Sequence, residues 1–158
     1  MLRQIEVLIP AGSRSWILLA QLAATLYLSG VIWTVQLAHY PLFARVGSAA
    51  WARYHAGHTT RMTWVVLVPM VVELGASGLL AAAPPVGVSR PLAAASFCLA
   101  VLTWAATFFV SVPLHGQLSV GWDAQAHRAL VSTNWIRTVL WSGHALIALE
   151  IVRRLLPR

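Results

Sequence analysis

Charged side chains are scarce in this sequence, and their scarcity excludes most soluble folds. Only 9% of the 158 residues are charged and 59% are hydrophobic, whereas a soluble domain carries about 25% charged residues. A helix needs about 20 mostly apolar residues to cross a bilayer, and four such stretches with short loops use nearly the whole chain. We therefore expect an all-α fold, a four-transmembrane-helix bundle that forms one integral membrane domain over residues 1–158.

Lysine is absent, and the net charge of +7 comes from 11 arginines set against four acidic residues. A strongly basic soluble protein would suggest a nucleic-acid partner. Here the arginines are scattered, mostly beside apolar segments, and form no basic run. Charges at helix ends orient membrane insertion and meet anionic lipid, so we expect the lipid bilayer, and no nucleic acid, as the partner.

Cysteine is nearly absent, and several catalytic motifs are missing altogether. The single Cys98 cannot form an internal disulfide, so cysteine usage says nothing about the compartment. The sequence contains no HExxH, no GxSxG, no glycine-rich phosphate loop and no CxxC or CxxCH. Nucleotide, phosphoryl and serine-hydrolase chemistry therefore have no support, and covalent c-type haem is excluded.

Apolar runs bounded by proline, glycine and polar residues set the expected helices. We predict them at about 15–38, 54–82, 90–112 and 124–154. Pro69 should kink the second helix, Pro113 should end the third, and Asp123 should cap the fourth. The first 15 residues lack the pattern of a cleaved signal, so the first helix is expected to be retained.

The arginines are distributed unevenly between the two ends of the predicted bundle. Four crossings put both termini on one side, which carries Arg3, Arg14, Arg90, Arg153, Arg154 and Arg158. The opposite side carries Arg45, Arg53 and Arg128, with Arg61 and Arg137 one or two turns deeper. Cytoplasmic loops are enriched in positive charge, so we expect both termini in the cytoplasm, with the protein in a bacterial inner membrane.

Five of the six histidines fall at the predicted helix ends opposite the termini, namely His39, His55, His58, His115 and His127. Each helix therefore brings at least one imidazole to the same level of the membrane. His55 and His58 are one turn apart, which can chelate a metal, with His39 or His115 as a third ligand. We predict His39, His55 and His58 as cofactor-binding residues and the same three with His115 as metal ligands. Two histidines from facing helices could instead hold a b-type haem.

Further polar residues follow stripes that should face the bundle interior, because polar groups facing lipid would go unpaired. One stripe on the second helix contains His55, His58, Met62 and Glu73, and one on the fourth contains His127, Asn134, Arg137, Trp141 and His144. Ionisable groups at depth cost about 2.5–3.5 kcal/mol each, which indicates function. The alternative is a polar network that only fixes helix register.

Glu73 is the only acidic residue in the predicted apolar core. It is either a general base or the partner of Arg61, Arg137 or a histidine. Arg137 would either clamp an anionic or carbonyl group of a substrate or hold Glu73. The helix halves on the side of the termini contain few polar residues, which argues against a continuous ion pathway.

Two segments resemble a known family. The first is Val112-Pro113-Leu114-His115-Gly116-Gln117-Leu118, and the second is Asn134-Trp135-Ile136-Arg137-Thr138. They are similar to the V-P-L-N-x-x-L and W-N-x-x-R-T segments of the small four-helix membrane family that includes fungal anthrone oxygenases and many uncharacterised bacterial proteins. The family's asparagine is His115 here, and the Asn-Trp order differs.

The resemblance implies oxidation of a polycyclic phenol with O₂, apparently without a cofactor, and makes His115, Asn134 and Arg137 part of the substrate site. Together with Glu73, these are the predicted catalytic residues. The additional histidines His39, His55 and His58 have no counterpart in that pattern and favour a metal. Because many proteins share such a fold, the resemblance does not fix a reaction.

These observations predict a small membrane oxidoreductase or oxygenase-like protein that acts on a hydrophobic phenolic or quinone-like ligand, with a transition metal, a b-type haem or acid–base histidines at its site. The alternative is a non-catalytic subunit of a larger membrane complex, with a membrane-protein partner or a homo-oligomeric assembly. Lipid and a partner helix favour the same apolar surface, so the sequence leaves both open.

Overall fold

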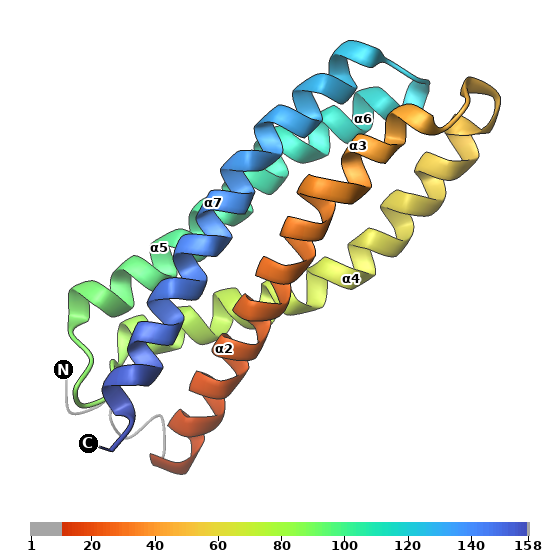
Figure 1. The fold of residues 1–158 in the computed structure, drawn as a ribbon. Helices are drawn as coiled ribbons and strands as arrows, with labels where there is room; N and C mark the ends of the chain where they lie inside the picture. The colour runs from red at the N-terminus through yellow and green to blue at the C-terminus, as the bar shows by residue number, and fades with distance from the viewer. Residues whose placement is uncertain (1–10, 158) are drawn as a thin grey trace.

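A computed structural model describes residues 11–157 of the chain, with side chains from residue 14 onward. Its elements form a bundle of long antiparallel helices (Figure 1). In chain order they are α2 (Ala11–Thr34), the π-helical turn η1 (Val35–His39), α3 (Tyr40–Leu42), the 3₁₀ turn η2 (Phe43–Arg45), α4 (Ser48–Ala82), α5 (Arg90–Ala106), the π-helical turn η3 (Thr107–Ser111), α6 (Val112–Val120) and α7 (Ala124–Leu155).

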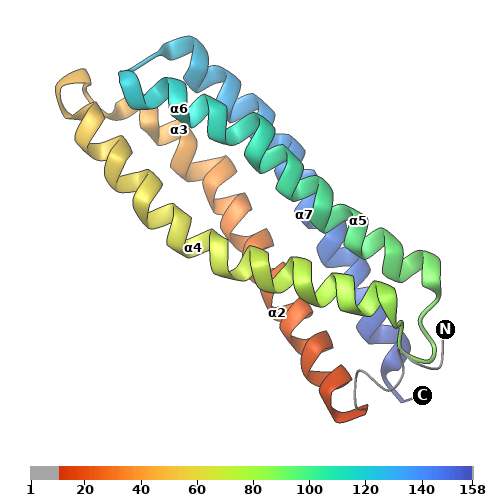
Figure 2. The ribbon, with the colours of Figure 1, turned by 180° about the vertical axis from the view of Figure 1, so that it is seen from behind.

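The elements join into four helical stretches that are long and apolar enough to cross a membrane, Arg14–Arg45, Ser48–Ala82, Arg90–Val120 and Ala124–Leu155. The predicted membrane-spanning bundle is therefore confirmed in its helix number and character. α2 packs against α4 and α7, and α5 packs against the same two helices. Figures 1 and 2 show the start of α2, the α4–α5 loop and the end of α7 at one end of the bundle, here called the terminal end. The opposite end is called the histidine end.

The connections at the histidine end are shorter than the sequence predicts. The first consists of residues 46–47 and the second of residues 121–123, whereas the predicted helix bounds left residues 39–53 and 113–123 as connectors. The error arose because Pro41 and Pro113 were read as helix stops. Each is the second residue after a π-helical turn. Proline lacks an N–H and clashes with the carbonyl of the preceding turn in a regular helix. The wider π turn accommodates this, so both helices continue.

Two other sequence features act as predicted. Pro69 lies inside α4, and both ribbon views show α4 changing direction about half-way along (Figures 1 and 2). Asp123 caps α7, because its Oδ1 accepts hydrogen bonds from the backbone N–H groups of Gln125 (2.7 Å) and Ala126 (2.9 Å). The bonds from Ala126 and Gln125 hold the pKa of the Asp123 carboxyl below its usual value. The cap therefore persists at neutral pH and is lost only as the pH falls through that lowered pKa.

An aromatic cluster closes the histidine end. Trp51 is buried and donates its indole N–H to the Leu118 carbonyl at 2.8 Å. Its ring stacks on His55 with centroids 5.2 Å apart, and Phe43 lies against the edge of the Trp51 ring. This packing shields the histidines behind it from the end of the bundle.

Candidate functional site

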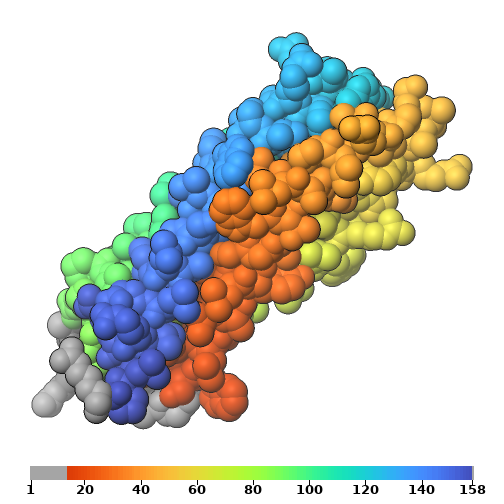
Figure 3. Space-filling view, in the orientation of Figure 1, coloured from red at the N-terminus to blue at the C-terminus, as the bar shows by residue number. Residues whose placement is uncertain are grey.

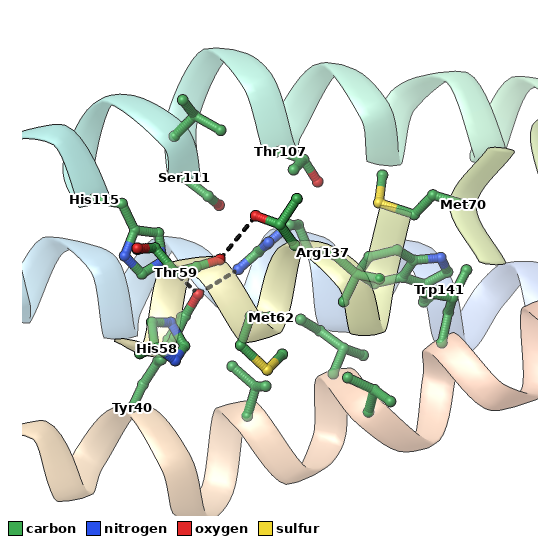
Figure 4. Close-up of a pocket in the computed structure, with 17 residues that line it drawn as sticks. Tyr40, His58, Thr59, Met62, Met70, Thr107, Ser111, His115, Arg137 and Trp141 are labelled. Atoms are coloured by element: carbon green, nitrogen blue, oxygen red, sulfur yellow. Dashed lines mark hydrogen bonds between the residues drawn. The ribbon is translucent and has the colours of Figure 1, made fainter. Parts of the chain in front are cut away.

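A cavity of about 280 Å³ lies inside the histidine half of the bundle, between α2, α4, the η3–α6 segment and α7. Its walls are largely apolar, with contributions from Leu28, Val31, Ile32, Val35, Met62, Val66, Met70, Val112 and Trp141. Figure 4 shows Tyr40, His58, His115 and Arg137 gathered at one end of this cavity and Met70 and Trp141 at the other. The cavity is therefore amphipathic along its length.

The two π-helical turns position the polar end. η1 precedes Tyr40, and η3 carries Thr107 and Ser111 on the cavity wall one turn before His115. A π turn adds a residue to the helical repeat and shifts the side chains that follow it, and such turns are frequent at functional sites. A strictly α-helical period therefore mispositions the residues downstream of each turn.

Arg137 is the central polar group of the cavity. Its Nη2 donates to the Tyr40 hydroxyl at 3.1 Å and to Asn134 Oδ1, and Asn134 Nδ2 donates to Gln36 Oε1 at 2.8 Å. The residue is 8% exposed, and its Nε has no hydrogen-bond partner. Within residues 14–157 no carboxylate lies within 4.0 Å of the guanidinium. A buried charge without a counter-charge is costly, so the protein keeps a cationic, partly unsatisfied donor against the cavity.

The four predicted metal-site histidines come together, as the sequence analysis expected. His39 Nε2 lies 2.8 Å from His58 Nδ1, and His55 Nε2 lies 3.1 Å from His115 Nδ1. The rings of His58 and His115 also pack together, with centroids 5.3 Å apart. His115 Nε2 contacts the Tyr40 hydroxyl at 2.8 Å. The hydroxyl thus links His115, and through it His55, to Arg137 in one hydrogen-bonded chain, whereas the His39–His58 pair meets this chain only by ring packing.

This arrangement bears on the two cofactors considered from the sequence. Among the residues that the structure describes, no three or more His, Cys, Asp or Glu side chains are arranged to hold a metal ion. The imidazoles instead contact one another in pairs. Their nitrogens touch directly, so neither pair has space for a porphyrin between its two rings. The geometry fits hydrogen bonding and proton exchange better than it fits haem.

Glu73 belongs to a second polar network, nearer the terminal end. Its Oε2 accepts from the Trp141 indole N–H at 3.0 Å, and its Oε1 lies 2.9 Å from His144 Nδ1 in a contact that is not a straight hydrogen bond. His144 Nε2 lies 2.9 Å from Ser96 Oγ, and Ser96 Oγ accepts from Gln21 Nε2 at 2.6 Å. All five side chains are at most 2% exposed.

The structure separates the predicted site residues into two groups. His115, Asn134 and Arg137 lie in the cavity network, but Glu73 does not line the cavity and is screened from it by Trp141. Of the partners considered for Glu73, the structure places a histidine beside it, since its Oε1 lies 2.9 Å from His144 Nδ1. Neither Arg61 nor Arg137 lies within 4.0 Å of the Glu73 carboxylate. Arg61 is exposed and bonds the carbonyl of Gly57 in its own helix, so it is not a core residue.

Sequence reasoning missed two residues that complete these networks. Tyr40 was passed over as part of a helix end, although it lies between His39 and Pro41, and it joins Arg137 to His115. Ser96 was not singled out because a serine in an apolar helix commonly bonds its own backbone. His127, the first residue of the predicted stripe on the fourth helix, is buried with Nε2 2.8 Å from the Tyr40 carbonyl.

No family model, no curated protein and no solved structure matches this chain.

Proposed function

We propose that this protein binds a hydrophobic ligand with an oxygen-bearing ring, of the quinone or phenol class, and acts on it as a small membrane oxidoreductase. The observation that carries the proposal is the buried Arg137 guanidinium, which faces an apolar cavity with no carboxylate partner in the described residues. A carbonyl or phenolate oxygen would supply the missing acceptor. Arginine suits this task because its planar group remains charged at every physiological pH.

The size and the side chains of the cavity indicate what the remainder of the ligand, beyond its oxygen atom, looks like. A space of about 280 Å³ is at the small end of ligand pockets, which suits a head of one or two rings. The Met62 and Met70 side chains can adapt to a flat ring, since thioethers pack well against aromatic faces. The Ser111 hydroxyl offers a further hydrogen bond along the wall, whereas Thr107 Oγ1 donates to the Thr103 carbonyl at 2.8 Å and can only accept from a ligand.

The histidines near the cavity support an oxidation that releases protons. Oxidation of a hydroquinone to a quinone releases two protons and two electrons. With molecular oxygen as the oxidant, the products are the quinone and hydrogen peroxide. His115 lines the cavity, touches Tyr40 and is in contact with His55. His58 also lines the cavity and contacts His39. An imidazole can accept a proton on one ring nitrogen and release one from the other, so these pairs would pass on the protons that the ring loses.

The first test is ligand binding by the purified protein in detergent. Titration with a short-chain benzoquinone should quench tryptophan fluorescence saturably, because Trp141 lines the cavity. Tyr40→Phe removes the hydroxyl that joins Arg137 to His115 and should weaken binding about tenfold, the effect of losing about 1.4 kcal/mol of hydrogen bonding. Tyr54→Phe, at an exposed position on α4, is the matched control and should bind as wild type. Absence of saturable quenching would leave the non-catalytic subunit as the better interpretation.

A metal ion is the second candidate for the same imidazoles. The contacts of 2.8 and 3.1 Å between ring nitrogens are close to the ~3.3 Å that separates two nitrogen ligands of a tetrahedral zinc ion. A small spreading of either pair would admit an ion. If this candidate is right, elemental analysis of the purified protein finds a stoichiometric transition metal, and His58→Ala loses it. Metal-free protein that still binds the quinone would eliminate the metal and retain the acid–base role.

A further inference from the structure

A second hollow lies beside the cavity, on the outside of the bundle. It is a groove of about 520 Å³ between α2 and α4, lined by Leu26, Tyr27, Gly30, Val31, Thr34, Val35, His39 and Met62. In Figure 3 the orange part of α2 lies directly beside the yellow part of α4 on this face. Leu26 and Tyr27 are 41% and 47% exposed, so the groove opens on the surface that meets lipid.

The groove and the cavity share part of their walls. Val31, Val35 and Met62 line both spaces. Of these three, Met62 has the unbranched and flexible side chain, and it is only partly buried. A change of its rotamer would join the two spaces without any movement of the backbone. The polar side chains follow the same route, since His39 in the groove contacts His58 in the cavity at 2.8 Å.

The two spaces differ in chemistry. The cavity ends on Arg137, Tyr40 and His115, whereas most of the groove is apolar and faces the hydrocarbon of the bilayer. A ligand that fills both must have a compact polar ring and an apolar extension. A small water-soluble phenol would fill only the cavity.

We propose that the ligand of this protein is a quinone-type ring that carries a long isoprenoid chain. It enters from the bilayer between α2 and α4. Its ring occupies the cavity against Arg137, and its chain lies in the groove past Met62. This inference rests on the proposed function and narrows it to a membrane-dissolved substrate. The alternative is that an ordinary lipid chain lies in the groove and that the groove has no connection to the cavity. The test must distinguish these two cases.

Substitutions of two glycines can test whether the chain of the ligand lies in the groove. A side chain at Gly30 would meet no atom within 4 Å of its Cβ, and Gly30 lines the groove. Gly30→Phe should therefore fill the groove without straining the helix. Gly75 on α4 is equally open at its Cβ but does not line the groove, so Gly75→Phe is the matched control. Gly30→Leu is a smaller second variant, and thermal unfolding in detergent checks that all three fold.

The probes are a benzoquinone that carries a ten-carbon alkyl chain and the same ring with a methyl group. Each dissociation constant is expressed against the probe concentration in the detergent phase, so that partitioning cancels. Wild type should bind the long-chain probe about tenfold more tightly, because a chain packed in a fixed groove gains contacts over one in mobile detergent. Gly30→Phe should abolish that preference while leaving methyl-probe binding unchanged. Gly75→Phe should alter neither, and Met62→Ala should speed association of the long-chain probe.

The outcomes separate this inference from the proposed function. One outcome is that wild type binds the two probes equally while Arg137→Gln binds neither. That result would contradict a role for the groove and would still support the ring site at Arg137. The same holds if Gly30→Phe leaves the preference intact, because the chain of the probe would then lie outside the groove. If neither probe binds, the proposed function and the inference both fail.

Discussion

Replacing Glu73 with alanine is expected to lower the free energy of unfolding by about 3–5 kcal/mol, the cost of breaking a buried ionisable pair by removing one partner. Glu73 and His144 are both fully buried, with Oε1 and Nδ1 2.9 Å apart. The same carboxyl accepts from the Trp141 indole at 3.0 Å. Alanine would leave both neighbours without this partner and open a cavity between α4 and α7. The measurement is unfolding of the purified protein in mixed micelles of increasing sodium dodecyl sulfate.

Two further variants serve as comparisons for the free energy of unfolding of Glu73→Ala. Glu73→Gln retains an oxygen that can accept from Trp141, so it should cost less than Glu73→Ala. Glu150→Ala removes an acid that pairs with Arg153 and Arg154 on the surface of α7, and it should leave the free energy of unfolding unchanged. A loss below about 1 kcal/mol in Glu73→Ala would contradict a structural role for the pair. The contact between Glu73 and His144 would then contribute little to the stability of the folded bundle.

The architecture followed from the sequence because membrane insertion leaves few choices. Unpaired backbone groups are so costly in hydrocarbon that long apolar runs become helices, and polar groups then face inward. The stripe on α7 illustrates this, since His127, Asn134, Arg137, Trp141 and His144 are all buried as the 3.6-residue period predicts. The gathering of His39, His55, His58 and His115 also followed from their shared level in the membrane.

The detailed partners could not be derived in the same way. A helical period gives the direction of a side chain but not the depth and rotation of the neighbouring helix, so Glu73 could not be assigned to His144 rather than Arg137. The π-helical turns before Pro41 and Pro113 add a second difficulty. They change the angle of everything that follows, which includes Tyr40 and His115. The only signal in the sequence was a proline within a run that otherwise continues as helix.

Arg137→Gln is expected to separate binding from stability, which a purely structural arginine would not do. Loss of a charge-assisted hydrogen bond to the ligand, about 1.5–3 kcal/mol, should weaken quinone binding about 10- to 150-fold. The unliganded protein should unfold no more easily than wild type, because the guanidinium is buried without a carboxylate partner in the described residues and its removal relieves an uncompensated charge. Glutamine can still donate to Asn134 or Tyr40, which limits the loss of hydrogen bonds.

The control for Arg137 is Arg61, which lies in the same half of the bundle but is exposed and bonds only the Gly57 carbonyl. Arg61→Gln should bind quinone as wild type does, which excludes a general effect of net charge. Arg137→Lys keeps the charge without the planar fork and should bind more weakly than wild type but better than glutamine. If Arg137→Gln instead unfolds easily and binds quinone normally once folded, the guanidinium only fixes helix register. In that case Tyr40 and Asn134 serve the same structural network, and the cavity has no demonstrated use for its charge.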